Sequence, residues 1–156
     1  MKNIIKGSLD RNDLTVGVVT AEFNSEVTFR LEEGALGELK KLGVRDVKAV
    51  RVPGAFEIPL AVKALLDAGC EGVVALGAVI RGETTHYDYV CAAVERGCSQ
   101  LQLDYGRPVG FGVLTTENDE QAMARAGGAH GNKGSEAARV VVEMASLLEQ
   151  LENVED

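Results

Sequence analysis

The segment GAVIRGETTHYDYV, residues 77–90, combines residue types that can bind an anion and move a proton. Its apolar run ends at Arg81 and is followed by Gly82, Glu83, two threonines and His86. Unpaired N–H groups at a helix N-terminus attract anions, and a glycine allows close backbone approach. A neutral imidazole beside such a turn can accept and return a proton. The alternatives are that the threonines only cap a helix and that the histidine is merely exposed.

Four apolar segments rich in β-branched residues predict the strands that position such loops, at 14–21, 47–52, 72–80 and 108–115. Amphipathic patterns predict helices at 25–42, 57–68, 86–103, 119–126 and 135–151. This alternation implies right-handed crossovers and a parallel sheet covered on both faces. We therefore expect one α/β domain over residues 1–156, a three-layer α/β/α sandwich around a four-stranded parallel sheet, with a flavodoxin-like outline.

The carboxyl ends of these strands are where an open parallel α/β sheet binds its ligands. Phe23 follows the first strand and Phe56 follows the second, at the same rim as the loop before His86. Two aromatic side chains on one rim favour stacking on a flat heterocycle. The alternative is that each phenylalanine only covers the core beneath its own loop.

The glycine-rich run GGAHGNKG, residues 127–134, precedes the last helix. Lys133 at its end can complement an anion, but the spacing is not that of a Walker loop, which excludes a nucleotide triphosphatase of that type. Read by itself the run is a connector, with His130 an exposed loop residue and Arg125 a surface charge.

The composition narrows the classes of partner. The formal net charge is −8, which disfavours nucleic acid, because binding to phosphate backbones needs a surplus of Lys and Arg. No segment has the apolar length of a membrane span, and the first residues are too polar for a secretory signal, so we expect a cytoplasmic protein. Three cysteines and two histidines fit no metal-ligand spacing. We expect no metal and no cofactor, with Cys91 and Cys98 as small core side chains.

Two features point to an oligomer. The last helix has an apolar face wider than one sheet surface requires, formed by Ala137, Val140, Val141, Met144, Leu147, Leu148 and Leu151. Within residues 1–12, the segment NIIKG resembles a strand without a partner in its own sheet. Helix packing and strand addition between subunits would use both features. The alternative is a broadly buried helix and a frayed end.

Several segments together resemble the lumazine synthase family of riboflavin biosynthesis. The matching stretches are EFN (22–24), VPGAFEIP (52–59), LGAVIRGETTHYDYV (76–90), FGVLTTEN (111–118), EQAMARAG (120–127) and GNKG (131–134). They occur in family order and spacing along essentially the whole chain. The resemblance implies a transferase that condenses 5-amino-6-(D-ribitylamino)uracil with 3,4-dihydroxy-2-butanone 4-phosphate, through an imine, phosphate elimination and ring closure. The competing hypotheses are a flavin- or lumazine-binding module without turnover and a protein that only builds a shell.

The resemblance also implies residue roles. Phe23 stacks on the pyrimidine, and the other residues that hold this substrate are Ala55, Phe56, Glu57, Ala78, Val79 and Ile80. The phosphate of the second substrate is bound by Glu83, Thr84 and Arg125, with Lys133 assisting electrostatically. His86 is the proton donor. Phe111 and Arg125 close the site from a neighbouring subunit.

The chain departs from the family pattern at three positions. Family members often have Arg where this chain has Glu22, and many carry a Glu–Lys pair where it has Ala124 and Ala129. Fewer basic groups then face the phosphate, so we expect weaker phosphate binding. Family members form pentamers, and many pack these into icosahedral shells. No insertion separates the last two predicted helices, which favours the shell, with riboflavin synthase as a further partner.

Overall fold

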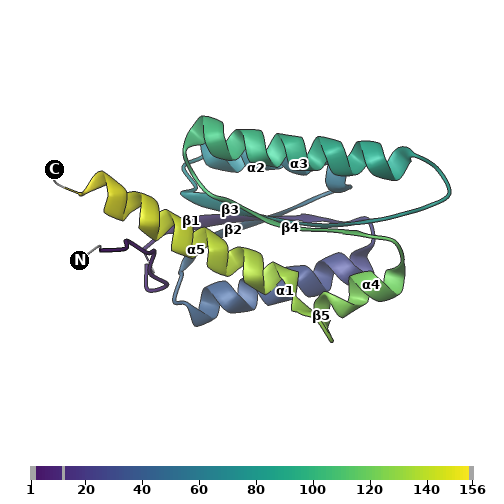
Figure 1. Ribbon diagram of the computed structural model, residues 1–156, viewed down its shortest axis with the longest axis horizontal. Coiled ribbons are helices and arrows are strands. Elements are labelled where there is room, and N and C mark those ends of the chain that lie inside the picture. The colour runs from purple at the N-terminus through teal and green to yellow at the C-terminus, as the bar shows by residue number, and fades with distance from the viewer. Residues whose placement is uncertain (1–2, 12, 155–156) are drawn as a thin grey trace.

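Four parallel strands form the central sheet, with helices on both faces (Figure 1). The computed structural model describes residues 3–11 and 13–154. The strands of this sheet are β1 (Thr15–Ala21), β2 (Asp46–Val52), β3 (Gly72–Ile80) and β4 (Val109–Thr116). The helices are α1 (Ser25–Lys41), α2 (Ile58–Asp67), α3 (His86–Tyr105), α4 (Asp119–Ala124) and α5 (Lys133–Glu152), and a 3-10 turn, η1 (Ala55–Glu57), precedes α2. A small hairpin, β5 (Ala126–Gly128) and β6 (Gly131–Asn132), joins α4 to α5.

The strand order β2-β1-β3-β4 places the chain reversal between β1 and β3. Helices α2 and α3 cover one face of the sheet, and α1 and α5 cover the other (Figure 1). This arrangement is the three-layer α/β sandwich with a flavodoxin-like strand order, and it confirms the predicted fold class. In such sheets the ligand site is expected beside the carboxyl ends of the two strands at the reversal.

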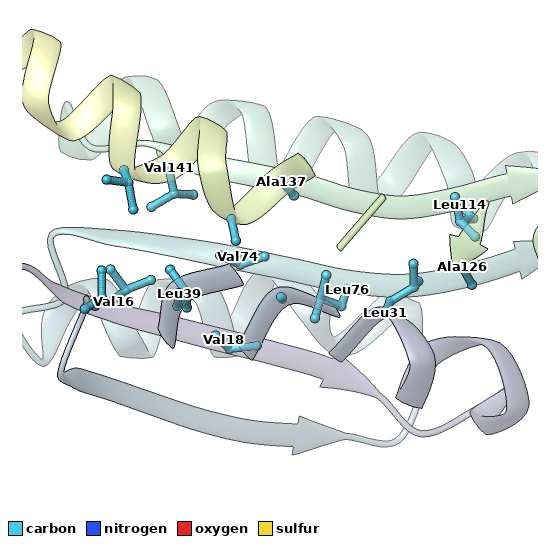
Figure 2. Close-up of a cluster of buried hydrophobic side chains, with 14 of the residues drawn as sticks. Val16, Val18, Leu31, Leu39, Val74, Leu76, Leu114, Ala126, Ala137 and Val141 are labelled. Carbon is cyan, nitrogen blue, oxygen red and sulfur yellow. The ribbon is translucent and has the colours of Figure 1, made fainter. Parts of the chain in front are cut away.

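Two apolar clusters hold these layers together. The cluster between the sheet and helices α1 and α5 includes Leu31, Leu39, Leu76 and Val141, all fully buried (Figure 2). The second cluster fills the space under α2 and α3. Full burial of one such side chain contributes about 1.5–3 kcal/mol, so these two clusters are the main source of stability.

Strand β2 differs from the expectation that both faces of the sheet are covered. It is an edge strand, and most of its residues are exposed, whereas β1 and β3 are almost fully buried. The helices lie over the centre of the sheet and leave this edge open. The free backbone groups of β2 are therefore available for another strand.

The segment between α4 and α5 also differs from the prediction. Helix α4 ends at Ala124 rather than at residue 126, because Ala126–Gly128 leaves the helix to pair with Gly131–Asn132. Helix α5 begins at Lys133, two residues earlier than predicted, because the Asn132 side chain accepts hydrogen bonds from the first free amides. The glycine-rich run is thus an ordered hairpin and not an irregular connector.

The N-terminal segment lies along α5 and forms no strand within residues 3–11. The Ser8 N–H donates to Ser146 Oγ at 2.9 Å, and Gln150 Nε2 donates to the Lys6 carbonyl at 3.0 Å. Residues 1, 2 and 12 of the expected arm lie outside the described residues. No helix of the described segments is long and apolar enough to cross a membrane.

The two cysteines of α3 face the second apolar cluster. Cys98 is buried there, and Cys91 is half-buried. Burial raises the pKa of the Cys98 thiol to about 12 and also raises that of Cys91. Both thiols are therefore protonated at neutral pH, and since the thiolate is the nucleophile, neither is suited to nucleophilic chemistry.

Candidate active site

An apolar pocket of about 780 Å³ opens at the carboxyl ends of β1, β2 and β3. We call it the aromatic pocket. Phe23 and Phe56 stand at it with 71% and 64% of their surface exposed. This exposure argues against the alternative that the two rings only cover the core. The other lining residues are Asn24, Pro53, Gly54, Ala55, Glu57, Ala78, Val79, Ile80, Gly82, Thr84, His86, Tyr87, Tyr89 and Val90.

Asn24 fixes the position of Phe23 at this rim. Its φ of 63° lies in the left-handed region, which asparagine tolerates better than most residues. Its Nδ2 donates to the Ala78 carbonyl at 2.9 Å, which ties the end of β1 to β3. The Phe23 N–H donates to the Pro53 carbonyl at 3.0 Å, which ties the same loop to the end of β2. The loop that carries the exposed ring is therefore held by one side-chain bond and one main-chain bond to two neighbouring strand ends.

The loop that follows β3 ends where α3 begins, at His86. The Thr84 hydroxyl accepts a hydrogen bond from the His86 N–H at 3.3 Å, so this threonine contributes to the helix start. Thr85 occupies the cap position and makes no side-chain cap bond. The His86 side chain is exposed and lines the aromatic pocket. The first amides of α3 and the imidazole thus lie at the mouth of the same cavity.

Arg81 contacts residues at both ends of the loop between β3 and α3. Its Nε lies 2.8 Å from Glu117 Oε2, and its Nη2 lies 3.4 Å from Asp88 Oδ1. The guanidinium also lies 4.5 Å from the centre of the Tyr87 ring, a cation–π contact. Arg81 thereby links the start of the loop to the first turn of α3 and to the loop after β4.

A second, basic pocket of about 450 Å³ lies between the end of β4, helix α4 and the start of α5. Its lining residues are Val113, Leu114, Thr115, Thr116, Gln121, Arg125, His130, Lys133 and Glu136. Arg125 follows the last residue of α4 and is half-buried, and its Nη1 donates to the Gln121 carbonyl at 2.9 Å. Lys133 is exposed at the first position of α5. Three basic side chains and one carboxylate make this pocket suitable for an anion.

The aromatic pocket and the basic pocket have no lining residue in common. The structure brings Phe23, Phe56 and His86 together, as predicted, but places Arg125 and Lys133 in the other pocket. A ligand that contacts both sets within one chain would have to bridge two separate cavities. The two sets of side chains therefore do not share one cavity within the chain.

Two predicted site residues line neither pocket. Phe111 lies on β4, half-buried against the second apolar cluster, and Glu83 is exposed on the loop before α3. His130, in contrast, lines a pocket although we expected it to be only an exposed loop residue. It is exposed on the hairpin and lines the basic pocket. Its position beside Arg125 depends on the hairpin pairing, which no periodic pattern in the sequence indicates.

The departure at Glu22 adds a carboxylate to the surroundings of Arg51. Arg51, on the adjacent strand β2, pairs with Glu32 at 2.8 Å and stacks on the Phe29 ring at 4.0 Å. The Glu32 carboxylate raises the pKa of Arg51, and the Glu22 carboxylate adds to this effect. Arg51 pairs with Glu32, and Glu22 acts on it only as a weaker, more distant charge.

The strand order and the two pockets define a flavodoxin-like α/β protein with small-molecule pockets at the carboxyl edge of its sheet. The family model described as 6,7-dimethyl-8-ribityllumazine synthase matches residues 13–149. The chain belongs to this family, and it is an enzyme, a transferase of riboflavin biosynthesis. The synthase of Bdellovibrio bacteriovorus is 60% identical over 138 residues, which cover 88% of this chain and 77% of that relative. The synthase of Desulfovibrio desulfuricans is 49% identical over 150 residues, which cover 94% and 96% of the two chains.

Proposed function

We propose that the chain condenses 5-amino-6-(D-ribitylamino)uracil with 3,4-dihydroxy-2-butanone 4-phosphate in a site made from two subunits. The aromatic pocket of one subunit takes the pyrimidine, and the basic pocket of its neighbour takes the phosphate. The observation that carries this proposal is the separation of the two pockets, each of which matches one substrate. Exposed rings suit the flat heterocycle, and a half-buried guanidinium beside a lysine suits the phosphate.

The reaction needs no group that these residues do not supply. The substrate amine attacks the ketone, and loss of water gives an imine. Phosphate then leaves with the electrons of its C–O bond, and ring closure releases a second water. His86 moves protons between the reacting nitrogen and oxygen atoms, and Arg125 and Lys133 stabilise the departing phosphate. Holding the two substrates against each other supplies much of the acceleration.

Each remaining site residue has a place in this proposal. Ala55, Phe56 and Glu57 bind the ribityl chain, and Ala78, Val79 and Ile80 offer backbone groups to the uracil edge. Glu83 and Thr84 join the phosphate contacts from the loop before α3. Phe111 reaches the site from the neighbouring subunit; its half-buried place on β4 supports only its nearness to the carboxyl edge.

We further propose that five subunits form a ring, that the rings build an icosahedral shell, and that riboflavin synthase is a further partner. The apolar side chains left exposed on α5 support the first step, namely Val140, Met144 and Leu151. The open edge of β2 supports strand addition by a neighbour's N-terminal segment, in which Ile4 is 91% exposed. The short hairpin between α4 and α5 supports the shell. The cytoplasmic location remains a prediction.

The test of this function is a two-substrate assay combined with a mass measurement. We expect lumazine absorbance to appear only when both substrates are present, and light scattering to give a particle larger than one chain. Tight riboflavin binding without product would instead support the binding module. Large particles without turnover or ligand binding would support the shell protein.

A mixed-variant experiment tests the shared site directly. His86→Ala damages the aromatic pocket and Arg125→Ala damages the basic pocket, so neither variant alone forms an intact site. When the two variants are co-expressed in equal amounts, about one quarter of the wild-type rate is expected. Random assortment places an intact aromatic pocket beside an intact basic pocket at about one site in four. The assay uses the phosphate substrate well below the KM of the Arg125 variant. A rate no higher than the mean of the two variants alone would contradict a site made from two subunits.

A further inference from the structure

The side chain of Asn132 joins helix α1 to the start of helix α5. Its Oδ1 accepts hydrogen bonds from the Gly134 N–H at 2.8 Å and the Ser135 N–H at 3.1 Å. Its Nδ2 donates to the carbonyl of Arg30 on α1 at 3.1 Å, across a separation of 102 residues. The amide therefore caps α5 and at the same time anchors that cap on another helix.

Gly34 provides the space that this anchor occupies. It lies one turn after Arg30 inside α1, where glycine is less favourable than alanine for the helix. A Cβ added at Gly34 would overlap the side-chain amide of Asn132 and displace it. Gly134 has a similar relation to the other helix, since its Cβ would overlap the Leu31 carbonyl. One glycine in each helix thus allows α1 and the start of α5 to approach closely around Asn132.

The two principal cations of the basic pocket are attached to this anchor. Lys133 is the residue next to Asn132, and the Lys133 N–H donates to the Arg125 carbonyl at 2.9 Å. In the hairpin, Asn132 pairs with Ala126, the residue after Arg125. A displacement of Asn132 would consequently move both Arg125 and Lys133 relative to the rest of the pocket. The pocket is lined by residues of β4, α4, α5 and the hairpin, while the anchor is bonded to Arg30 on α1.

We propose that Asn132, whose side-chain amide packs against Gly34, is a positioning residue that sets the geometry of the basic pocket for the phosphate substrate. This inference rests on the proposed function, in which Arg125 and Lys133 bind that phosphate. Asn132 itself does not line the pocket and acts through the backbone that carries the two cations. Misplacement of a binding group by about 1 Å costs up to about 100-fold in rate, so a short backbone shift is sufficient for a measurable effect.

Gly34→Ala and Gly37→Ala form a matched pair for the test. Both substitutions add one methyl group to the same helix, but a Cβ at Gly37 meets no atom within 4 Å. Gly34→Ala is expected to raise KM for 3,4-dihydroxy-2-butanone 4-phosphate about tenfold and to leave KM for the pyrimidine within about twofold. Gly37→Ala is expected to leave both KM values unchanged. Equal KM values for the phosphate substrate in the two variants, or an equal rise for both substrates in Gly34→Ala, would overturn the inference.

Asn132→Ser separates the anchor from the cap. Serine is a good N-cap, so this variant retains the start of α5 but loses the bond to Arg30. It is expected to raise KM for the phosphate substrate. Gly34→Ala added to Asn132→Gly, which leaves no side chain to overlap and is also tolerated at an N-cap, is expected to raise this KM no further than Asn132→Gly alone. A further rise in the double variant would overturn the inference, since Gly34 would then act through another contact.

Arg125→Ala, measured in the same assay, distinguishes the phosphate-binding role of the basic pocket from the positioning role of Asn132. If it raises KM for the phosphate substrate while Gly34→Ala and Asn132→Ser do not, the anchor has no positioning role and the proposed function stands. If Arg125→Ala leaves this KM unchanged, the assignment of the basic pocket fails, and the inference about Asn132 fails with it.

Discussion

Replacement of His86 by alanine is expected to lower kcat by about 100-fold or more, the contribution that one positioned proton-transfer group makes. His86 lies at the first position of α3 with its side chain exposed into the aromatic pocket. The other histidine of the chain, His130, lines the basic pocket and is not placed to take over this role in the same subunit. Steady-state kinetics with both substrates in excess measures the loss.

The same substitution is expected to leave pyrimidine binding nearly intact, because the rings of Phe23 and Phe56 make the main contacts. A binding titration with the pyrimidine alone checks this. Ser99→Ala, on an exposed part of the same helix, is the control for changes in α3 itself. An unchanged kcat in His86→Ala would remove the proton-transfer role from this residue and leave positioning as the source of catalysis.

Arg125→Ala is expected to raise KM for 3,4-dihydroxy-2-butanone 4-phosphate by about 10- to 100-fold. Hydrogen bonds to a charged group contribute about 1.5–3 kcal/mol, which corresponds to this range. The effect is expected near its upper end because the Glu–Lys pair common in the family is replaced by Ala124 and Ala129, so few other cations share the anion. KM for each substrate, measured at a fixed saturating concentration of the other, gives the result.

Arg139→Ala is the matched control for this experiment. Arg139 is an exposed arginine on α5 that pairs with Glu38 at 2.9 Å, outside both pockets. We expect it to leave KM for both substrates unchanged. An equal loss for both substrates in Arg125→Ala, or a smaller particle mass, would indicate failed assembly and contradict a specific role in phosphate binding.

The central fold could be predicted because its strands carry a strong physical signal. Continuous β-branched runs such as residues 72–80 are typical of strands buried on both faces, and β3 has these bounds in the structure. The hairpin between α4 and α5 gives no such signal. Its shape depends on the positive φ angles of Gly127 and Gly131 and on the anchor at Asn132, which joins residues distant in the sequence. Local patterns indicate only a connector there.

The site could be predicted only as far as its strand ends. Phe23, Phe56 and His86 follow three different strands, and the parallel topology is sufficient to bring them together. The position of Arg125 could not be obtained in this way. It depends on where α4 ends, and that end is set by the hairpin rather than by helix propensity. Phe111 could not be placed in this way either, because it is half-buried on β4 and lines neither pocket of its own chain.

The contacts of the N-terminal segment have a practical consequence for attaching tags and reporter groups. Arg11 pairs with Glu149 near the end of α5 and lies 3.7 Å from Glu71, just before β3 begins. Both ends of the described chain therefore lie beside the amino edge of the sheet (Figure 1), whereas both cavities lie toward its carboxyl edge. A fluorescent label or a fused domain attached after Val154 would start far from both cavities of its own subunit.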